Sequence, residues 1–273
     1  MSGMERLSHP ARAISEFAHI TANNRPGTPL YDATTVTGIL QGMVDQAPEL
    51  KDIAAPILAS ICIGAHRADI VPYLLDLKIT AHPDPSENSQ LSTVIARFSD
   101  VIMTVWPFVG IPWIVPAVLG IGKCLYDKGI EDSAGFAKSR GPLSPDVHNT
   151  LGRATNKRTY SKVNNPEVGA TISTYFPEFS NTIVTVIFGY SMGGTTMCGR
   201  YEDFETQLLV MSAISASGAT RQAISHTKAS LGMGNRIEVV EAVVNAIRKF
   251  TTWNGEPVAK VDVRELAREV ASS

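Results

Sequence analysis

The chain has 273 residues, of which 44% are hydrophobic and 18% charged, with a formal net charge of -2 and a pI near 6.3. This composition is typical of a globular protein with a substantial core and excludes an intrinsically disordered chain. No run of Lys and Arg supplies the basic surface that a nucleic-acid binder needs, so we expect no nucleic-acid partner.

The cysteines and the N-terminus indicate the compartment. Cys62, Cys124 and Cys198 lie far apart and form no CxxC pair or metal-ligand pattern. Reduced thiols in a cytoplasmic protein fit this spacing better than a disulfide framework. The first residues mix acidic and basic side chains and lack the apolar segment of a secretory signal. The sequence also carries no nucleotide motif, so we expect a cytoplasmic protein without a metal or other cofactor.

The apolar residues predict helices in chain order, because they recur at helical spacing while strand patterns are scarce. Apolar stripes run through residues 54–61, 208–215 and 239–250, and residues 262–270 form a short amphipathic segment. Capping residues predict helix starts at Asp32, at Ser86 to Ser89, at Asn165 before Pro166, and at Asp203. The fold class expected is therefore all-α.

An uncharged run over residues 101–122 is long enough to cross a bilayer. Pro107, Pro112 and Pro116 interrupt it, and Gly110 lies between the first two. Proline removes a backbone donor and clashes with the preceding turn, so a helix should break or kink near residues 107–112. We expect two buried helical segments joined by a tight turn, and no membrane partner.

Two linkers and a short repeat predict the domain organisation. Residues 81–88 and 131–149 are rich in Pro and in small or polar residues, and the second segment is the better boundary. Segment 56–68 aligns with segment 210–222 at one constant offset. The identical pairs are Ala59 with Ala213, Gly64 with Gly218, Ala65 with Ala219 and Arg67 with Arg221. The halves expected are residues 20–130 and 150–273.

Residues 176–247 resemble the carboxymuconolactone decarboxylase and alkylhydroperoxidase D family. A Pro-containing helix ends in an aromatic–glycine pair, Phe188–Gly189, and a long helix leads to Gly218, a histidine and an acidic helix. The first half is similar to the family's aromatic-x-Gly-x-Pro turn at Phe108–Pro112. The resemblance implies a helical bundle of two related halves, a homo-oligomer such as a dimer or trimer, and a small-molecule substrate.

The chain departs from the peroxidase branch of this family at the positions that matter for chemistry. Aligned on His226, the family's glutamate position holds Gln207, and its two cysteine positions hold Ala219 and Gln222. Without thiolates there is no nucleophile for a peroxide, so peroxidase activity is disfavoured. Pro72 occupies the histidine position of the first half, which therefore looks catalytically degenerate.

The candidate catalytic residues are His226 and Glu205. Imidazole serves as a general acid or base near neutral pH, although His226 could instead bridge helices as a structural residue. Glu205 could orient it or share a proton, but an acidic residue in a first helical turn also simply complements the helix dipole. Gln207 could hydrogen-bond a substrate carbonyl but cannot move protons.

Aromatic residues form the second candidate set. Trp106, Phe108 and Trp113 surround the Gly–Pro turn and either line a pocket for a flat ligand or pack in the core. Tyr190 lies in the run Gly189–Gly194, which we expect to be a flexible loop near the site. Cys62 and His66 are one helical turn apart, so they form either a thiol–imidazole pair or, as we favour, a structural cysteine near a helix end.

These observations favour a cofactor-independent lyase or isomerase. It would decarboxylate, isomerise or cyclise a small organic acid, lactone or polyketide-like metabolite, with His226 as general acid or base. The alternative is a non-catalytic ligand-binding or scaffold protein on a decayed fold. A third hypothesis, a thiol peroxidase that uses Cys62 or Cys198, requires those thiols to react with peroxide.

Overall fold

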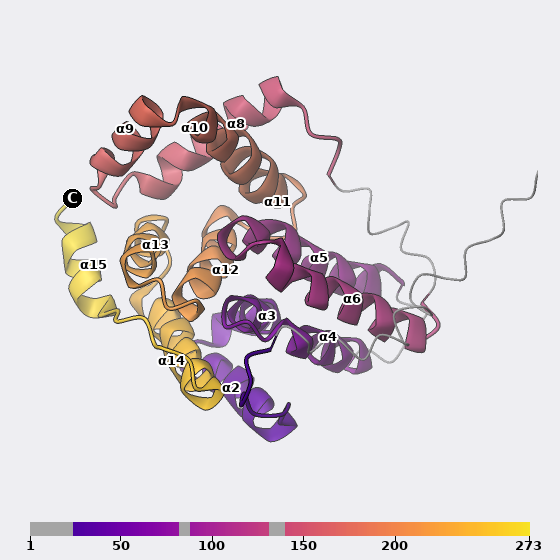
Figure 1. Ribbon diagram of the computed structural model, residues 1–273. Helices are drawn as coiled ribbons and strands as arrows, with labels where there is room; N and C mark the ends of the chain where they lie inside the picture. The colour runs from indigo at the N-terminus through magenta and orange to yellow at the C-terminus, as the bar shows by residue number, and fades with distance from the viewer. Residues whose placement is uncertain (1–23, 82–87, 131–139) are drawn as a thin grey trace, which may run out of the picture.

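A computed structural model describes residues 24–81, 88–130 and 140–273, and every regular element in these ranges is a helix (Figure 1). The predicted all-α class is confirmed. The helices of the first part are α2 (Ala33–Gln46), η1 (Pro48–Leu50), α3 (Ala54–Gly64), η2 (Ala68–Ile70), α4 (Val71–Thr80), α5 (Asn88–Val109) and α6 (Ile111–Asp127). Those that follow are α8 (Pro145–Tyr160), α9 (Pro166–Tyr175), α10 (Pro177–Thr182), the π-helix η3 (Ile183–Gly193), α11 (Gly194–Met197), α12 (Asp203–Ala216), α13 (Thr220–Gly232), α14 (Ile237–Asn254) and α15 (Val263–Ala271).

The predicted helix starts agree with the structure where it describes them. The Asp32 carboxylate caps α2 by accepting hydrogen bonds from the backbone N–H groups of Thr34 and Thr35, each at 3.1 Å. Helix α9 begins directly after Asn165, and α12 begins at Asp203. Helix α5 begins at Asn88, whereas Ser86 and the first 23 residues lie outside the described ranges.

Helices α3 and α12 form the centre of the molecule. Every residue of α3 is buried, as expected of a helix that is apolar all round, and α12 is buried from Thr206 onwards. The two helices pack directly on each other through Gly64, where an added Cβ would lie 2.1 Å from the Ala213 carbonyl oxygen. Only glycine permits this backbone approach.

The other helices cover this central pair. Helix α2 packs on α14, α5 on both α3 and α12, α4 on α6, and α13 on α15. One core cluster contains buried residues from Val36 to Leu266, so both ends of the chain contribute to it. Of the predicted linker, residues 131–139 lie outside the described ranges and residues 145–149 belong to α8. The division into two related halves remains a prediction.

The aligned repeat segments have similar but not identical geometry. Helix α3 is followed by His66 with a φ of 59°, and α12 by Gly218 with a φ of 79°. Each helix therefore ends in a left-handed residue before the next helix. Gly64, which the repeat aligns with Gly218, lies inside α3 instead and serves the close contact with α12.

The uncharged run folds into two helices, as predicted. Helix α5 ends at Val109, Gly110 has a φ of 88°, and α6 begins at Ile111. Helix α6 is less buried than expected, because Ile111, Val115 and Val118 are 63%, 42% and 46% exposed. Among the described helices, Gln90–Val109 alone is long and apolar enough to cross a membrane, a test that core helices of soluble proteins also pass.

Helices α8, α9 and α10 and the π-helix η3 form an arch over α12 and α13 (Figure 1). Helix α8 packs along η3 through two glycines. A Cβ on Gly152 would lie 1.8 Å from the Val184 carbonyl oxygen, and a Cβ on Gly189 would lie 2.0 Å from that of His148. Backbone therefore meets backbone along this contact, which fixes α8 against η3.

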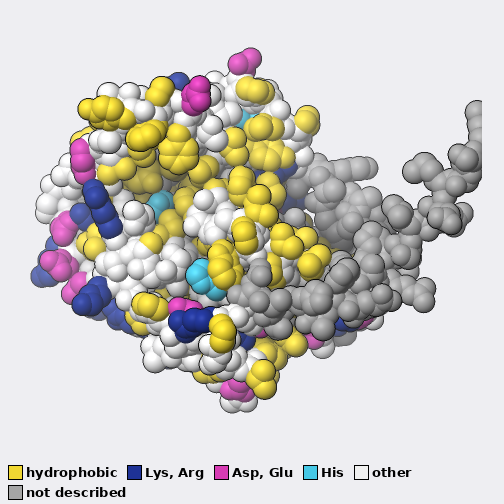
Figure 2. Space-filling model, viewed as in Figure 1, with side chains coloured by type: hydrophobic (Ala, Val, Ile, Leu, Met, Phe, Trp, Pro, Cys, Tyr) yellow, Lys and Arg dark blue, Asp and Glu magenta, His cyan; other side chains and the backbone are white. Residues whose placement is uncertain are grey.

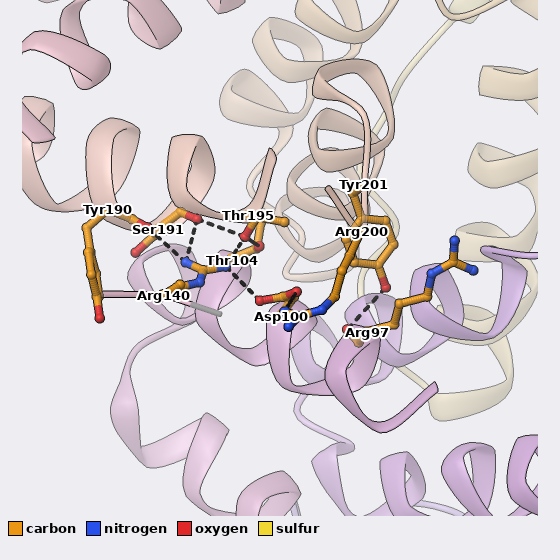
Figure 3. A network of polar contacts seen from close by, with 9 residues as sticks. All are labelled: Arg97, Asp100, Thr104, Arg140, Tyr190, Ser191, Thr195, Arg200 and Tyr201. Carbon is orange, nitrogen blue, oxygen red and sulfur yellow. Dashed lines mark hydrogen bonds and ion pairs between the residues drawn. The ribbon is translucent and has the colours of Figure 1, made fainter. Parts of the chain in front are cut away.

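Arg140 ties this arch to the central helices (Figure 3). Its guanidinium donates to the Tyr190 and Ser191 carbonyl oxygens of η3, both at 2.8 Å, and to Asp100 of α5 at 3.0 Å. Asp100 also pairs with Arg200 at 2.5 Å. The side chains of Asp100 and Arg140 are only 3% and 8% exposed, so this ion cluster is largely shielded from water.

Candidate functional site

A cleft of about 1090 Å³ lies between the arch and the helices α12 and α13. Its outer wall is mostly apolar and includes Val168, Ile172, Phe179, Ile183 and Ile187. Figure 2 shows hydrophobic side chains gathered on the part of the surface that α8 to α10 form. Such a cleft can bind an apolar molecule of small to moderate size.

His226 of α13 lies on the inner wall of the cleft and is only 4% exposed. Behind it, the Gln207 Nε2 atom lies 3.0 Å from the His226 Nδ1 atom and 3.1 Å from the His226 carbonyl oxygen. Gln207 is completely buried in α12. One amide group therefore holds both the ring and the backbone of His226.

Tyr160, the last residue of α8, contacts the other side of the imidazole. Its hydroxyl oxygen lies 3.3 Å from the His226 Nε2 atom, the long end of the hydrogen-bond range. Phe108 meets the His226 ring edge to face at 5.7 Å, and Phe188 meets the Tyr160 ring in the same way at 5.8 Å. Aromatic rings thus enclose the polar pair, and Tyr160, Phe108 and Phe188 all line the cleft.

Burial sets the protonation of this pair. It lowers the pKa of His226 to about 4, because the imidazolium ion loses its hydration. It raises the pKa of Tyr160 to about 12, because the phenolate is destabilised in the same way. At neutral pH the site therefore presents a neutral imidazole and a protonated phenol.

The charged side chains that line the cleft, Lys157 and Arg221, are both basic. Arg221 is largely exposed and lies 3.7 Å from Glu167, so this pair is a weak surface contact. No Asp or Glu side chain lines the cleft among the described residues. The side-chain charge at the rim is therefore basic, and Glu167 offsets part of it at Arg221.

Three of the predicted site residues come together: His226, Gln207 and Phe108. Glu205 does not join them. Its carboxylate accepts a hydrogen bond from the Glu202 backbone N–H at 2.8 Å and completes a capping box at the start of α12. Residues two positions apart on a helix point about 200° apart, so Glu205 and Gln207 face opposite sides.

The other predicted aromatic residues lie outside the cleft. Trp106 packs against the core cluster, and the Trp113 ring stacks on His66 at 4.0 Å. The Tyr190 ring meets His148 edge to face at 5.0 Å. Tyr190 belongs to the π-helix, so the expected flexible loop at Gly189–Gly194 is instead helical.

The thiol–imidazole alternative finds no geometric support. Cys62 is fully buried, and burial raises the pKa of its thiol well above the ordinary value. His66 stacks on Trp113 instead. Within the described ranges, no group of three or more His, Cys, Asp or Glu side chains could hold a metal ion.

No sequence pattern marks Tyr160 or Phe188 as a site residue. Phe188 appeared only as part of an aromatic–glycine pair, and Tyr160 lies 66 positions from His226, a separation at which no spacing rule operates. Ala219 and Gln222, which the predicted resemblance aligns with the two cysteine positions of the peroxidase branch, line the cleft.

Comparison with known proteins adds no assignment to this geometry. No family model matches the chain, and no curated protein sequence matches it significantly. The resemblance to the carboxymuconolactone decarboxylase family therefore remains a prediction from the motifs.

Proposed function

We propose that the chain is a cofactor-independent lyase or isomerase of the carboxymuconolactone decarboxylase-like type. It acts on a small organic acid, lactone or polyketide-like metabolite that binds in the His226 cleft. The observation that carries this proposal is a neutral, buried imidazole that faces a cleft with a mostly apolar outer wall, with a hydroxyl group at 3.3 Å.

Decarboxylation, isomerisation and cyclisation of such compounds share one demand on the protein. Negative charge develops on a carbonyl oxygen when CO₂ leaves or when an α-proton passes to water, and hydrogen-bond donors stabilise the resulting enolate. Tyr160 and His226 supply polar atoms at this place, and the apolar outer wall supplies binding. The basic residues at the rim suit an acidic substrate.

A non-catalytic ligand-binding protein is the second candidate. The observation that favours it is the engagement of both ring nitrogens of His226, one with Gln207 and the other with Tyr160. An imidazole in this state holds the cleft together but has no nitrogen available to remove a substrate proton. Ligand binding without turnover would follow.

Deuterium exchange separates the two candidates. The protein would be incubated in D₂O with a panel of keto acids and unsaturated lactones, and NMR would follow α-C–H exchange and loss of CO₂. The proposal expects catalysed exchange or decarboxylation by the native chain and a loss of at least tenfold in His226→Asn. Ser173→Ala, a change on exposed α9 outside the cleft, is the matched control.

If the native chain bound some of these compounds but catalysed neither exchange nor decarboxylation of any of them, the ligand-binding candidate would be favoured. Equal rates in the native chain and His226→Asn would remove His226 from the mechanism. Either result would be interpreted only for variants that keep the native circular dichroism and thermal midpoint.

The same proposal has the protein act as a cytoplasmic homo-oligomer, a dimer or trimer. The apolar side chains of Ile111, Val115 and Val118 support this, because they form an exposed stripe along α6 at helical spacing. Light scattering after size exclusion would give the subunit number, and Val115→Lys should shift it towards the monomer.

A further inference from the structure

The orientation of the Gln207 amide is determined by its neighbours. The carbonyl oxygen of His226 can only accept a hydrogen bond, and it lies 3.1 Å from the end of the Gln207 side chain. The nitrogen of the amide must therefore face it, because the opposite orientation would place two oxygens against each other. The Gln207 Oε1 atom is buried without a partner among the described residues, so Nε2 alone sets the orientation.

This orientation fixes the tautomer of His226. The second hydrogen of the same NH₂ group points to the Nδ1 atom at 3.0 Å, which must then be an acceptor without a proton. In a neutral imidazole the proton is then on Nε2. The Nε2–H group consequently donates to the Tyr160 hydroxyl oxygen.

The hydroxyl proton of Tyr160 therefore does not point at His226. His226 is the one hydrogen-bond partner of this hydroxyl within the described ranges, and it uses the oxygen rather than the proton. Tyr160 lines the cleft and keeps its proton at neutral pH. Each step from Gln207 to Tyr160 is thus a donation in the same direction, towards the cleft.

We infer that Tyr160 contacts the ligand by donating its hydroxyl hydrogen bond to a ligand carbonyl oxygen, and that Gln207 is the positioning residue that sets this direction through His226. The inference rests on the proposed function for the choice of ligand only. It assigns to the cleft an apolar molecule with a carbonyl oxygen and an anionic group. It also gives His226 the role of a donor that strengthens the Tyr160 hydroxyl as an acid.

A glutamate at position 207 would reverse the chain of donation. A carboxylate only accepts, so the imidazole proton would move to Nδ1, and Nε2 would accept from the Tyr160 hydroxyl. The hydroxyl proton would then point at His226, and the ligand would lose its donor. With the amide of Gln207 the Tyr160 hydroxyl donates to the ligand. With a carboxylate at position 207 it would donate to His226 instead.

Nitrogen-15 NMR of the histidine rings tests the direction without any ligand or turnover. The native chain should show His226 protonated at Nε2 between pH 6 and 8, and Gln207→Glu should show it protonated at Nδ1 or at both nitrogens. Gln222→Glu makes the same chemical change in the cleft without a bond to His226, and it should keep the native tautomer. A native His226 protonated at Nδ1 would overturn the inference, even if Gln207→Glu failed to fold.

A matched pair of probes tests the contact with Tyr160. Octanoate and 4-oxo-octanoate differ by one carbonyl group, and isothermal titration would give both dissociation constants. One neutral hydrogen bond predicts about fivefold tighter binding of the keto acid to the native chain. The preference should vanish in both Tyr160→Phe and Gln207→Glu.

An equal preference in Tyr160→Phe would overturn the assigned contact, whatever the NMR spectra show. If neither probe bound the native chain, the assigned ligand class would be wrong. An Nε2 tautomer in the same sample would still establish the direction of donation. Failure of catalysis in the exchange assay leaves both measurements interpretable, so the two proposals fail separately.

Discussion

Acidification should destabilise this protein through His226, because the folded state holds the imidazole neutral. Its pKa falls from 6.5 in an exposed chain to about 4 in the fold. Between these values the unfolded chain binds a proton that the folded chain does not, so the free energy of unfolding falls as the pH falls. The free energy of unfolding falls by up to about 1.4 kcal/mol for each pH unit, which gives a loss of about 3 kcal/mol between the two pKa values. Above about pH 6.5 the imidazole is neutral in both states, so its titration no longer changes the free energy of unfolding.

The variant His226→Asn isolates this contribution. Urea unfolding at pH 4.5, 5.5, 6.5 and 7.5 would give the free energy of unfolding of both chains. Other titrating groups affect both chains alike, so the stability difference between them should be constant above pH 7 and shrink by about 3 kcal/mol towards pH 4. Parallel stability curves across this window would show that His226 titrates normally, and the argument from burial would then be wrong.

Three further substitutions and one labelling experiment test the packing of the fold. Gly152→Ala should lower stability by about 3 kcal/mol in a urea melt, because a Cβ would lie 1.8 Å from a Val184 backbone oxygen. Gly169→Ala, where an added Cβ meets open space inside a helix, should raise stability by about 0.5–1 kcal/mol, and a loss there would contradict this account. Asp100→Asn should lower the free energy of unfolding by about 3–5 kcal/mol in the same measurement, because it leaves Arg140 and Arg200 without their shared carboxylate. A loss below about 1 kcal/mol would show that this buried ion cluster contributes little to stability. Cys62 should react with a thiol reagent only at the rate of global opening, and fast labelling in native buffer would refute its burial.

The parts of the fold that local chemistry determines could be predicted from the sequence. Asp32 caps a helix because its carboxylate reaches two backbone N–H groups in its own turn. Gly110 breaks the uncharged run because it adopts a positive φ that other residues avoid. Both signals lie within a few residues of the feature they determine.

The π-helix and the Tyr160 contact could not be predicted in this way. The π-helix packs against α8 through Gly152 and Gly189, and neither glycine reveals its partner in the sequence. Glu205 was a plausible partner for His226 by charge, yet its position on the helix turns it away. Gln207 was a candidate from the sequence and does contact His226, but the direction of its hydrogen bonds follows only from the geometry.

The two walls of the cleft are built by different means, and this determines how a ligand would act on the site. Backbone contacts at Gly152 and Gly189 fix α8 and η3 as one unit, whereas Gln207 fixes His226 to the hairpin of α12 and α13. The 3.3 Å contact between Tyr160 and His226 joins the two units in the cleft. A ligand that draws the hydroxyl proton of Tyr160 makes its oxygen a better acceptor, so that contact should shorten as the ligand binds. The same event would close the walls on the ligand and strengthen the donor that holds it.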